Sequence, residues 1–219
     1  MIVTIDGPAA SGKGTVAKGL ATRLGFAYLD TGAMYRAVAL TAIRRGVDCG
    51  DSAAVAALVP AIHIEMPPDR VLLNDEDVTA AIREPLVSQG ASKVAAILAV
   101  RLFLVPQQQR IAEGRDIVCE GRDQGTAVFP RAPVKFYVTA DVRVRAERRY
   151  KELAAKGVET SLEREVSELI ERDRRDSERA DGPLRQPPDA VVIDTSDRGI
   201  ESVIDEMEGV VRRCATVRT

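Results

Sequence analysis

The sequence predicts an α/β protein built on a five-stranded parallel β-sheet with helices on both faces. Short β-branched runs alternate along the chain with segments of helical periodicity, which is typical of β-α-β units whose strands lie parallel. The chain has 219 residues, of which 45% are hydrophobic, so it can bury a sizeable core. Both observations favour a doubly wound fold.

The five predicted strands are short apolar runs rich in β-branched residues, and they occupy residues 2–5, 26–29, 116–120, 134–139 and 190–194. The predicted helices lie between them, at residues 13 to about 24, about 32 to 45, within 85–113, 141–156 and 161 to about 179. In the third helical segment we expect Pro106 to kink or divide the helix, because proline has no amide hydrogen to donate. The last two helices are highly charged and are separated by Gly157.

Residues 61–77 interrupt this alternation. The segments "IHIEM", "RVLLN" and "DVT" are separated by "PPD" and "DED", whose residues favour turns. We expect a small antiparallel insert here, at about 61–84, in a single domain that spans 1–219 with its core at about 1–60 and 85–219. His63, the one histidine, is expected to pack in this insert, which excludes histidine-based catalytic triads.

The charged residues include 25 arginines and only six lysines, although the net charge is −2. The planar arginine fork suits phosphates, but ion-paired surface helices or genomic base composition explain the bias equally well. Three cysteines without a C-x-x-C pair argue against a disulfide framework. With no leader and no long apolar run, we expect a cytoplasmic protein.

A glycine-rich loop, "GPAASGKGT", follows the first strand and precedes a helix. This arrangement aims backbone amides and the positive end of the helix at a phosphate. We expect the loop to bind a nucleoside triphosphate, with Lys13 reaching the β- and γ-phosphates. The binding residues are then Gly7, Pro8, Ala9, Ala10, Ser11, Gly12, Lys13, Gly14 and Thr15. The usual hydroxyl after the lysine is missing, because Gly14 stands there and the first hydroxyl belongs to Thr15.

The variant "GKGT" is similar to the loop of the nucleoside monophosphate kinases. Three further stretches, "YLDTGAMYR", "EGRDQGTAVFP" and "ERDRRDSERADGPL", stand in order behind it. Together they closely resemble the bacterial cytidylate kinases from about residue 2 to residue 200. The resemblance implies a P-loop kinase core, an enlarged monophosphate-binding insert and a short helical lid at about 150–165. It also implies a reaction in which ATP with Mg²⁺ phosphorylates CMP or dCMP.

The resemblance assigns roles to residues in these motifs. Three arginines, Arg36, Arg122 and Arg172, would grip the acceptor phosphate, and Ser92, Arg101 and Asp123 would face the cytosine. The monophosphate pocket would be completed by Thr31, Asp176 and Arg179, and Arg148 and Arg149 would belong to the lid. With Lys13, the residues Arg122, Arg172, Arg148 and Arg149 would be catalytic. Surface ion pairing remains the alternative for Arg36, Arg122 and Arg172. Ser92 could equally be an ordinary helix residue, and Arg101 a solvated one.

The metal ligands are left open by the sequence. Glu120 stands where many relatives carry Asp before "GRD", and it either pairs with an arginine or contacts Mg²⁺ through water. Thr15 is a second candidate for such a contact. Because Mg²⁺ keeps several waters, the phosphates can hold it largely by themselves.

Two other functions are alternatives to this one. A related small-molecule kinase, such as an adenylate or shikimate kinase, is opposed by the insert and by "EGRDQGT". A regulatory or RNA-binding module is opposed by the acidic residues interleaved with the arginines and by an aromatic content of 4%. We therefore expect a monomer that acts on small nucleotides, with neither nucleic acid nor a membrane as partner.

Overall fold

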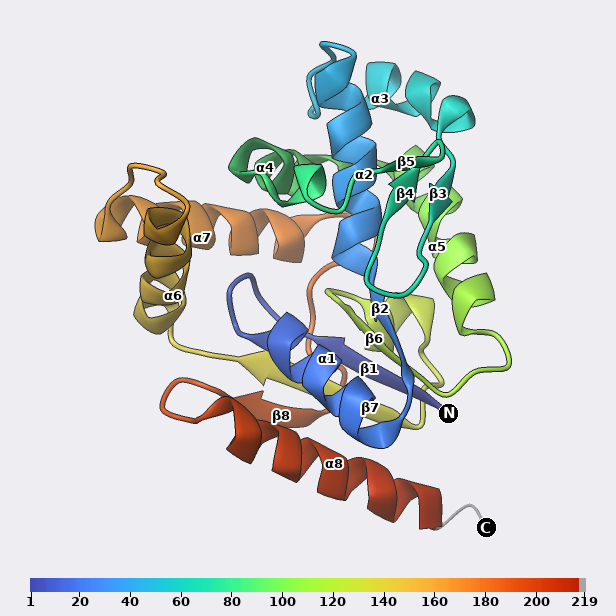
Figure 1. Cartoon of the computed structure of the whole chain (residues 1–219), viewed down its shortest axis with the longest axis vertical. Helices are drawn as coiled ribbons and strands as arrows, with labels where there is room; N and C mark the ends of the chain where they lie inside the picture. The colour runs from blue at the N-terminus through green and yellow to red at the C-terminus, as the bar shows by residue number, and fades with distance from the viewer. Residues whose placement is uncertain (217–219) are drawn as a thin grey trace. The chain divides into compact units, whose positions relative to one another are not determined.

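The computed structural model describes residues 1–216, and the chain divides into two compact units (Figure 1). The core unit comprises residues 1–28 together with the chain from residue 114 onward. The second unit, residues 29–113, we call the helical unit.

The predicted five-stranded sheet is confirmed. Its strands stand in the order β2-β6-β1-β7-β8. They are β1 (Ile2–Asp6), β2 (Ala27–Asp30), β6 (Ile117–Gly121), β7 (Val134–Thr139) and β8 (Val191–Asp194). The central strand β1 pairs in parallel with β6 and with β7, so the carboxyl ends of these strands meet at one edge. In open α/β sheets ligands bind at that edge.

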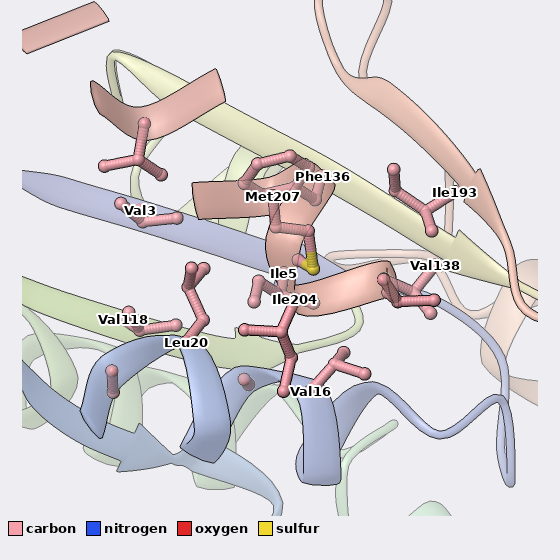
Figure 2. Packing of buried hydrophobic residues seen from close by; sticks show 14 of the residues in the cluster. Val3, Ile5, Val16, Leu20, Val118, Phe136, Val138, Ile193, Ile204 and Met207 are labelled. Atoms are coloured by element: carbon pink, nitrogen blue, oxygen red, sulfur yellow. The ribbon is translucent and has the colours of Figure 1, made fainter. Parts of the chain in front are cut away.

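Helices α1 (Lys13–Leu24) and α8 (Ile200–Thr216) pack against the sheet over an apolar core (Figure 2). Leu20 of α1, Met207 of α8 and Phe136 of β7 all belong to this core. The two helices approach closely, since a Cβ atom on Gly19 would lie 2.4 Å from the Ile204 side chain. The α8 helix is absent from our sequence-based elements, and it gives β8 its cover.

The remaining elements of the core unit follow β6 and β7. A five-residue π-helix, η3 (Gln124–Val128), comes directly after β6. Helix α6 (Val142–Ala155) follows β7 and packs against α7 (Leu162–Glu178). The turn that separates them holds Gly157 at φ 72°, a conformation that glycine adopts without strain.

The helical unit is organised around α2 (Thr31–Arg44), which packs against α4 (Pro85–Val94) and α5 (Leu98–Ala112). Along the chain, three short helices separate α2 from α4: α3 (Ser52–Leu58), η1 (Val59–Ala61) and η2 (Ala81–Arg83). An antiparallel sheet of three two-residue strands occupies the predicted insert, in the order β3 (Ile64–Glu65), β4 (Leu72–Leu73) and β5 (Glu76–Asp77). His63 does not pack there as expected, because its side chain is 68% exposed beside Glu65.

The expected role of Pro106 as a helix divider is wrong. Helix α5 runs continuously through Pro106, and the division lies at residues 95–97. There the amides of Ala96 and Ile97 bond the carbonyls three residues back, and Ile97 then turns to an extended conformation. Tight i→i+3 bonds of this kind end an α-helix.

Among residues 1–216 no single helix is long and apolar enough to cross a membrane. Helices α4 and α5 together satisfy that length and composition, but they are bent by 99° at the break between them.

Candidate functional site

The phosphate-binding loop lies between β1 and α1, at the carboxyl edge of the sheet, as predicted. Gly7 has φ 153°, and a Cβ atom there would lie 2.0 Å from the backbone oxygen of Val138, so no other residue fits. Gly12 takes the left-handed conformation at the N-cap of α1 and has no side chain to cap the helix. The first amides of α1 therefore receive no side-chain cap from this position, and a bound anion can accept from them.

Lys13 is buried beside the loop, with 7% of its surface exposed, and its Nζ donates to the carbonyl oxygen of Pro8 at 3.1 Å. Burial, reinforced by the nearby guanidinium groups of Arg122 and Arg172, lowers the pKa of Lys13 to about 7, although the carboxylate of Glu120 opposes this. Burial and the neighbouring positive charges disfavour the charged form of Lys13, and a phosphate bound beside it would favour that form. The arrangement suits the binding of a polyphosphate.

Two ion pairs of the core unit lie near one another, and the first of them acts on Lys13. The Nε of Arg122 donates to Asp176 at 3.0 Å, and Arg179 lies 3.4 Å from Asp123. Burial alone would raise the pKa of Asp176, but the guanidinium groups of Arg122, Arg172 and Arg179 lower it below its ordinary value. The structure thus brings together the predicted residues of "EGRD" and of α7, and Asp176 stays a carboxylate.

Asp6, the last residue of β1, fixes the turn that carries Arg122 and Asp123. Its two carboxylate oxygens accept from the backbone amides of Gln124 at 2.9 Å and of Gly125 at 2.7 Å. Burial raises the pKa of Asp6 to about 7, against the effect of those two hydrogen bonds. Sequence reasoning missed this residue, whose signal was a carboxylate directly before a glycine-rich loop.

Glu120 and Gly14 face one another across the start of α1. The carboxylate of Glu120 is buried, and a Cβ atom on Gly14 would lie 3.6 Å from its Oε2 atom. A methyl group at position 14 would make an ordinary van der Waals contact with that carboxylate. In the described part of the chain no three His, Cys, Asp or Glu residues gather to hold a metal. The residues present therefore fit a Mg²⁺ ion that is held mainly by phosphates and water, with one carboxylate nearby.

The helical unit has its own cationic group at the start of α2. Asp30 caps this helix by accepting from the Ala33 amide at 3.0 Å, and its other oxygen accepts from Arg36 at 2.7 Å and from Arg83 at 2.9 Å. Gly32 leaves room for the guanidinium of Arg36 to fold back, since a Cβ atom there would lie 3.0 Å from it. Arg83 was not predicted; its partner Asp30 lies 53 residues away in the sequence.

The other predicted residues of the helical unit are buried. Arg101 of α5 donates to the Tyr35 hydroxyl of α2 at 3.2 Å, which holds its guanidinium in place. Thr31, the first residue of α2, and Ser92 of α4 are each at most 5% exposed. Buried polar side chains of this kind are suited to fixed contacts with a ligand.

The two predicted lid arginines lie on α6 in different surroundings. Arg148 donates to the hydroxyl of Thr195 at 3.0 Å and to its carbonyl oxygen at 2.6 Å, and Thr195 in turn donates to the Ser11 carbonyl of the loop at 2.9 Å. Arg149 pairs with Glu152 at 3.0 Å on the surface of the same helix. Arg148 is thus tied to the phosphate-binding loop, whereas Arg149 bonds within its own helix.

Comparisons with known proteins agree with this geometry. The family model described as cytidylate kinase matches residues 3–213. A cytidylate kinase of Solibacter usitatus is 50% identical over 218 residues, covering 99% of this chain and 94% of the relative. A second, from Methylococcus capsulatus, is 45% identical and covers 96% of both chains.

Solved structures share the fold at much lower sequence identity. A shikimate kinase from Bacteroides thetaiotaomicron superimposes with a TM-score of 0.53 at 12% identity, covering 97% of this chain and 98% of that one. A gluconokinase from Sinorhizobium meliloti gives 0.52 at 13% identity, with 99% and 94% covered. At these identities the likeness concerns the fold alone. The family model and the close relatives carry the assignment, and the chain belongs to the cytidylate kinase family.

Proposed function

We propose that this chain transfers the γ-phosphoryl group of ATP to CMP or dCMP, giving ADP and CDP or dCDP. One observation carries the proposal: in a member of this family, a glycine-rich loop and a buried lysine stand beside a cluster of arginines and carboxylates within one unit. A phosphoryl transfer between two nucleotides requires several cations, because it brings two sets of phosphates together.

The donor nucleotide binds, in this proposal, along Gly7–Thr15. Backbone amides of the loop and of the start of α1 would donate to its phosphates, and Lys13 would move from the Pro8 carbonyl to the β- and γ-phosphates. Arg122 and Arg172 would neutralise charge on the transferred group, with Arg148 and Arg149 closing from α6. The reaction needs no general base, because a phosphate oxygen of the acceptor is already ionised near neutral pH.

Mg²⁺ is proposed as the metal of the donor nucleotide. It would neutralise the phosphate charge and orient the transferred group when bound. The buried carboxylate of Glu120, beside the space left by Gly14, would fix one of its waters, and the Thr15 hydroxyl is a second candidate. The remainder of its shell would come from phosphates and water.

The acceptor is proposed to be read in the core unit by Asp123, whose carboxylate can accept from the N4 amino group of cytosine. Asp176 would accept from the ribose hydroxyls, and Arg179 would bind with it. In the helical unit we propose separately that Arg36 and Thr31 act on the acceptor phosphate and that Ser92 and Arg101 act on the base.

Substituting Asp123 by alanine should raise the KM for CMP at least tenfold and change the KM for ATP by less than twofold, since a base-reading hydrogen bond to a charged group is lost. Steady-state kinetics with each nucleotide varied in turn would check this. In Asp123→Asn the amide can donate to the O4 of uracil, so this variant should prefer UMP more than the parent chain does. Equal rises in both KM values for Asp123→Ala would show that Asp123 does not read the base.

The reaction itself is tested by incubating the chain with ATP, Mg²⁺ and CMP and following ³¹P resonances. We expect stoichiometric formation of CDP and ADP, and its loss when the metal is removed by a chelator. ATP hydrolysis that proceeds equally without CMP would contradict the proposal. We further propose that the protein is a monomer and acts in the cytoplasm. Sedimentation of the purified chain would test its oligomeric state.

A further inference from the structure

One residue of the phosphate-binding loop has both of its backbone polar groups bound by a single ion pair. The amide of Ala9 donates to Oδ1 of Asp173 at 3.3 Å, and its carbonyl oxygen accepts from Nη1 of Arg145 at 3.0 Å. Arg145 and Asp173 are themselves joined at 2.6 Å. The loop backbone, a carboxylate from α7 and a guanidinium from α6 thus form a closed ring of hydrogen bonds, which we call the Ala9 clamp.

The clamp is shielded from water. The side chains of Arg145 and Asp173 are 8% and 20% exposed, and Ala9 packs in an apolar cluster with Ala146 of α6 and Leu169 of α7. Arg145 is further fixed because its Nε donates to the carbonyl oxygen of Ala140. The contact between Arg145 and Asp173, at 2.6 Å, is a short charge-assisted hydrogen bond, and bonds of this kind are geometrically specific.

The residue that follows the clamp needs support. Ala10 has φ 57°, in the left-handed region that residues with a side chain rarely adopt. Such a conformation persists only where the surrounding structure holds it in place. The clamp holds the preceding residue by both its amide and its carbonyl, and Thr195 holds the following Ser11 by its carbonyl.

The same two helices carry residues already proposed to act on the phosphates and the acceptor. Asp173 lies between Arg172 and Asp176 on α7, and Arg145 precedes Arg148 by one turn of α6. Neither Arg145 nor Asp173 belongs to the residues assigned by the sequence motifs to ATP or CMP. A shift of α7 would therefore be transmitted to the loop through the clamp.

We propose that Arg145 and Asp173 are positioning residues that set the backbone of the phosphate-binding loop for ATP and couple it to the acceptor-binding residues of α7. The inference rests on the proposed phosphoryl transfer. The pair acts through Ala9 and not by contact with either nucleotide.

The test uses Asp173→Asn in the full chain. An asparagine has one acceptor oxygen where the clamp needs two, so its amide group would face either the Ala9 amide or the Arg145 guanidinium. We expect the KM for ATP to rise about tenfold, as for the loss of a hydrogen bond to a charged group, while the dissociation constant for CMP measured without a donor nucleotide changes less than twofold. The affinity for CMP should also lose its dependence on a bound ATP analogue.

A matched control separates positioning from stability. Lys135 is a buried cation that bridges a backbone carbonyl, that of Pro130, and the carboxylate of Asp189, away from the loop. Asp189→Asn makes the same chemical change in the same unit. Because Asp189 is 61% exposed, Asp189→Asn should lower the melting temperature by less than Asp173→Asn does, and it should leave the KM for ATP at the parental value.

Arg145→Lys supplies a second readout. A lysine keeps the charge but has one nitrogen in place of the guanidinium fork, so the KM for ATP should rise less in Arg145→Lys than in Asp173→Asn. Because the two residues belong to one clamp, the double variant should raise the KM for ATP little beyond Asp173→Asn alone. The affinity for ATP, measured by calorimetry without CMP, should be highest in the parent chain, lower in Arg145→Lys and lowest in Asp173→Asn. An Asp173→Asn variant that keeps the parental KM for ATP overturns the inference, and so does one that loses affinity for CMP alone. A parent chain that makes no CDP would instead refute the proposed function.

Discussion

Replacing Lys13 by methionine should lower kcat about a thousandfold and leave the fold intact. The loss follows the size expected when one preorganised charge that stabilises a transition state is removed. Methionine has a similar length and no charge, so it can occupy the buried site beside the Pro8 carbonyl. Turnover of CMP at saturating ATP measures the effect.

The pKa of Lys13 makes a second, thermodynamic prediction for the same variant. A lysine whose pKa is lowered to about 7 in the folded chain disfavours its charged form there, whereas in the unfolded chain it titrates near 10.5. The folded state is therefore destabilised progressively as the pH falls from about 10.5 to about 7. Lys13→Met removes that effect, so at pH 7 it should be at least as stable as the parent chain.

A control for this variant is available on the same helix. Lys18 is exposed on α1, and Lys18→Met should retain parental kcat. Parental turnover in Lys13→Met would refute the role of the loop in catalysis. A collapse of its thermal transition at pH 7 would refute the energetic description of the site.

Replacing Arg122 by glutamine should reduce both activity and stability. The arginine is close to Lys13 and bonds Asp176 at 3.0 Å, with 17% and 4% of the two side chains exposed. We expect a fall of about a thousandfold in kcat, since arginines that reach a phosphoryl transition state contribute at least this much. We also expect the free energy of unfolding to fall by about 3 kcal/mol, because Asp176 keeps a buried charge without that partner.

A double variant distinguishes these two effects. Arg122→Gln with Asp176→Asn removes both charges of the pair, so most of the lost stability should return. Activity should not return, because the cation that serves the phosphates is still missing. Recovery of activity together with stability in the double variant would show that Arg122 is a structural partner of Asp176 and nothing more.

The elements of the sheet could be predicted because they are local. Each buried parallel strand is a short apolar run, and the strand at 134–139 lies where the sequence places it. The break between α4 and α5 could not be predicted, because the apolar stripe continues through Ala95 and Ile97. Proline usually interrupts a helix, so the sequence places the break at Pro106, whereas in the folded chain α5 continues through that residue. The α8 helix does carry an amphipathic pattern in the sequence, with Val203, Met207 and Val211 on its buried face.

The site was predictable where a motif names its residues and not where partners come from distant parts of the chain. Lys13, Arg122, Asp123 and Asp176 stand in motifs, and the structure places them together in the core unit. Arg145 and Asp173 meet Ala9 from 136 and 164 residues away, and the charged helices that hold them look like solvated surfaces in sequence. Packing against the loop is what distinguishes these two residues from the other charges of α6 and α7.

The central claim is most directly tested by offering the chain ATP and Mg²⁺ with CMP, dCMP, UMP, AMP or shikimate in parallel and measuring kcat/KM for each acceptor. UMP carries an oxygen in place of the N4 amino group of cytosine, AMP carries a larger purine ring, and shikimate has no base, so the acceptors should be separated widely. The account predicts that CMP and dCMP are phosphorylated with the highest kcat/KM and that shikimate is not phosphorylated. A kcat/KM for AMP or shikimate that equals or exceeds that for CMP would contradict it.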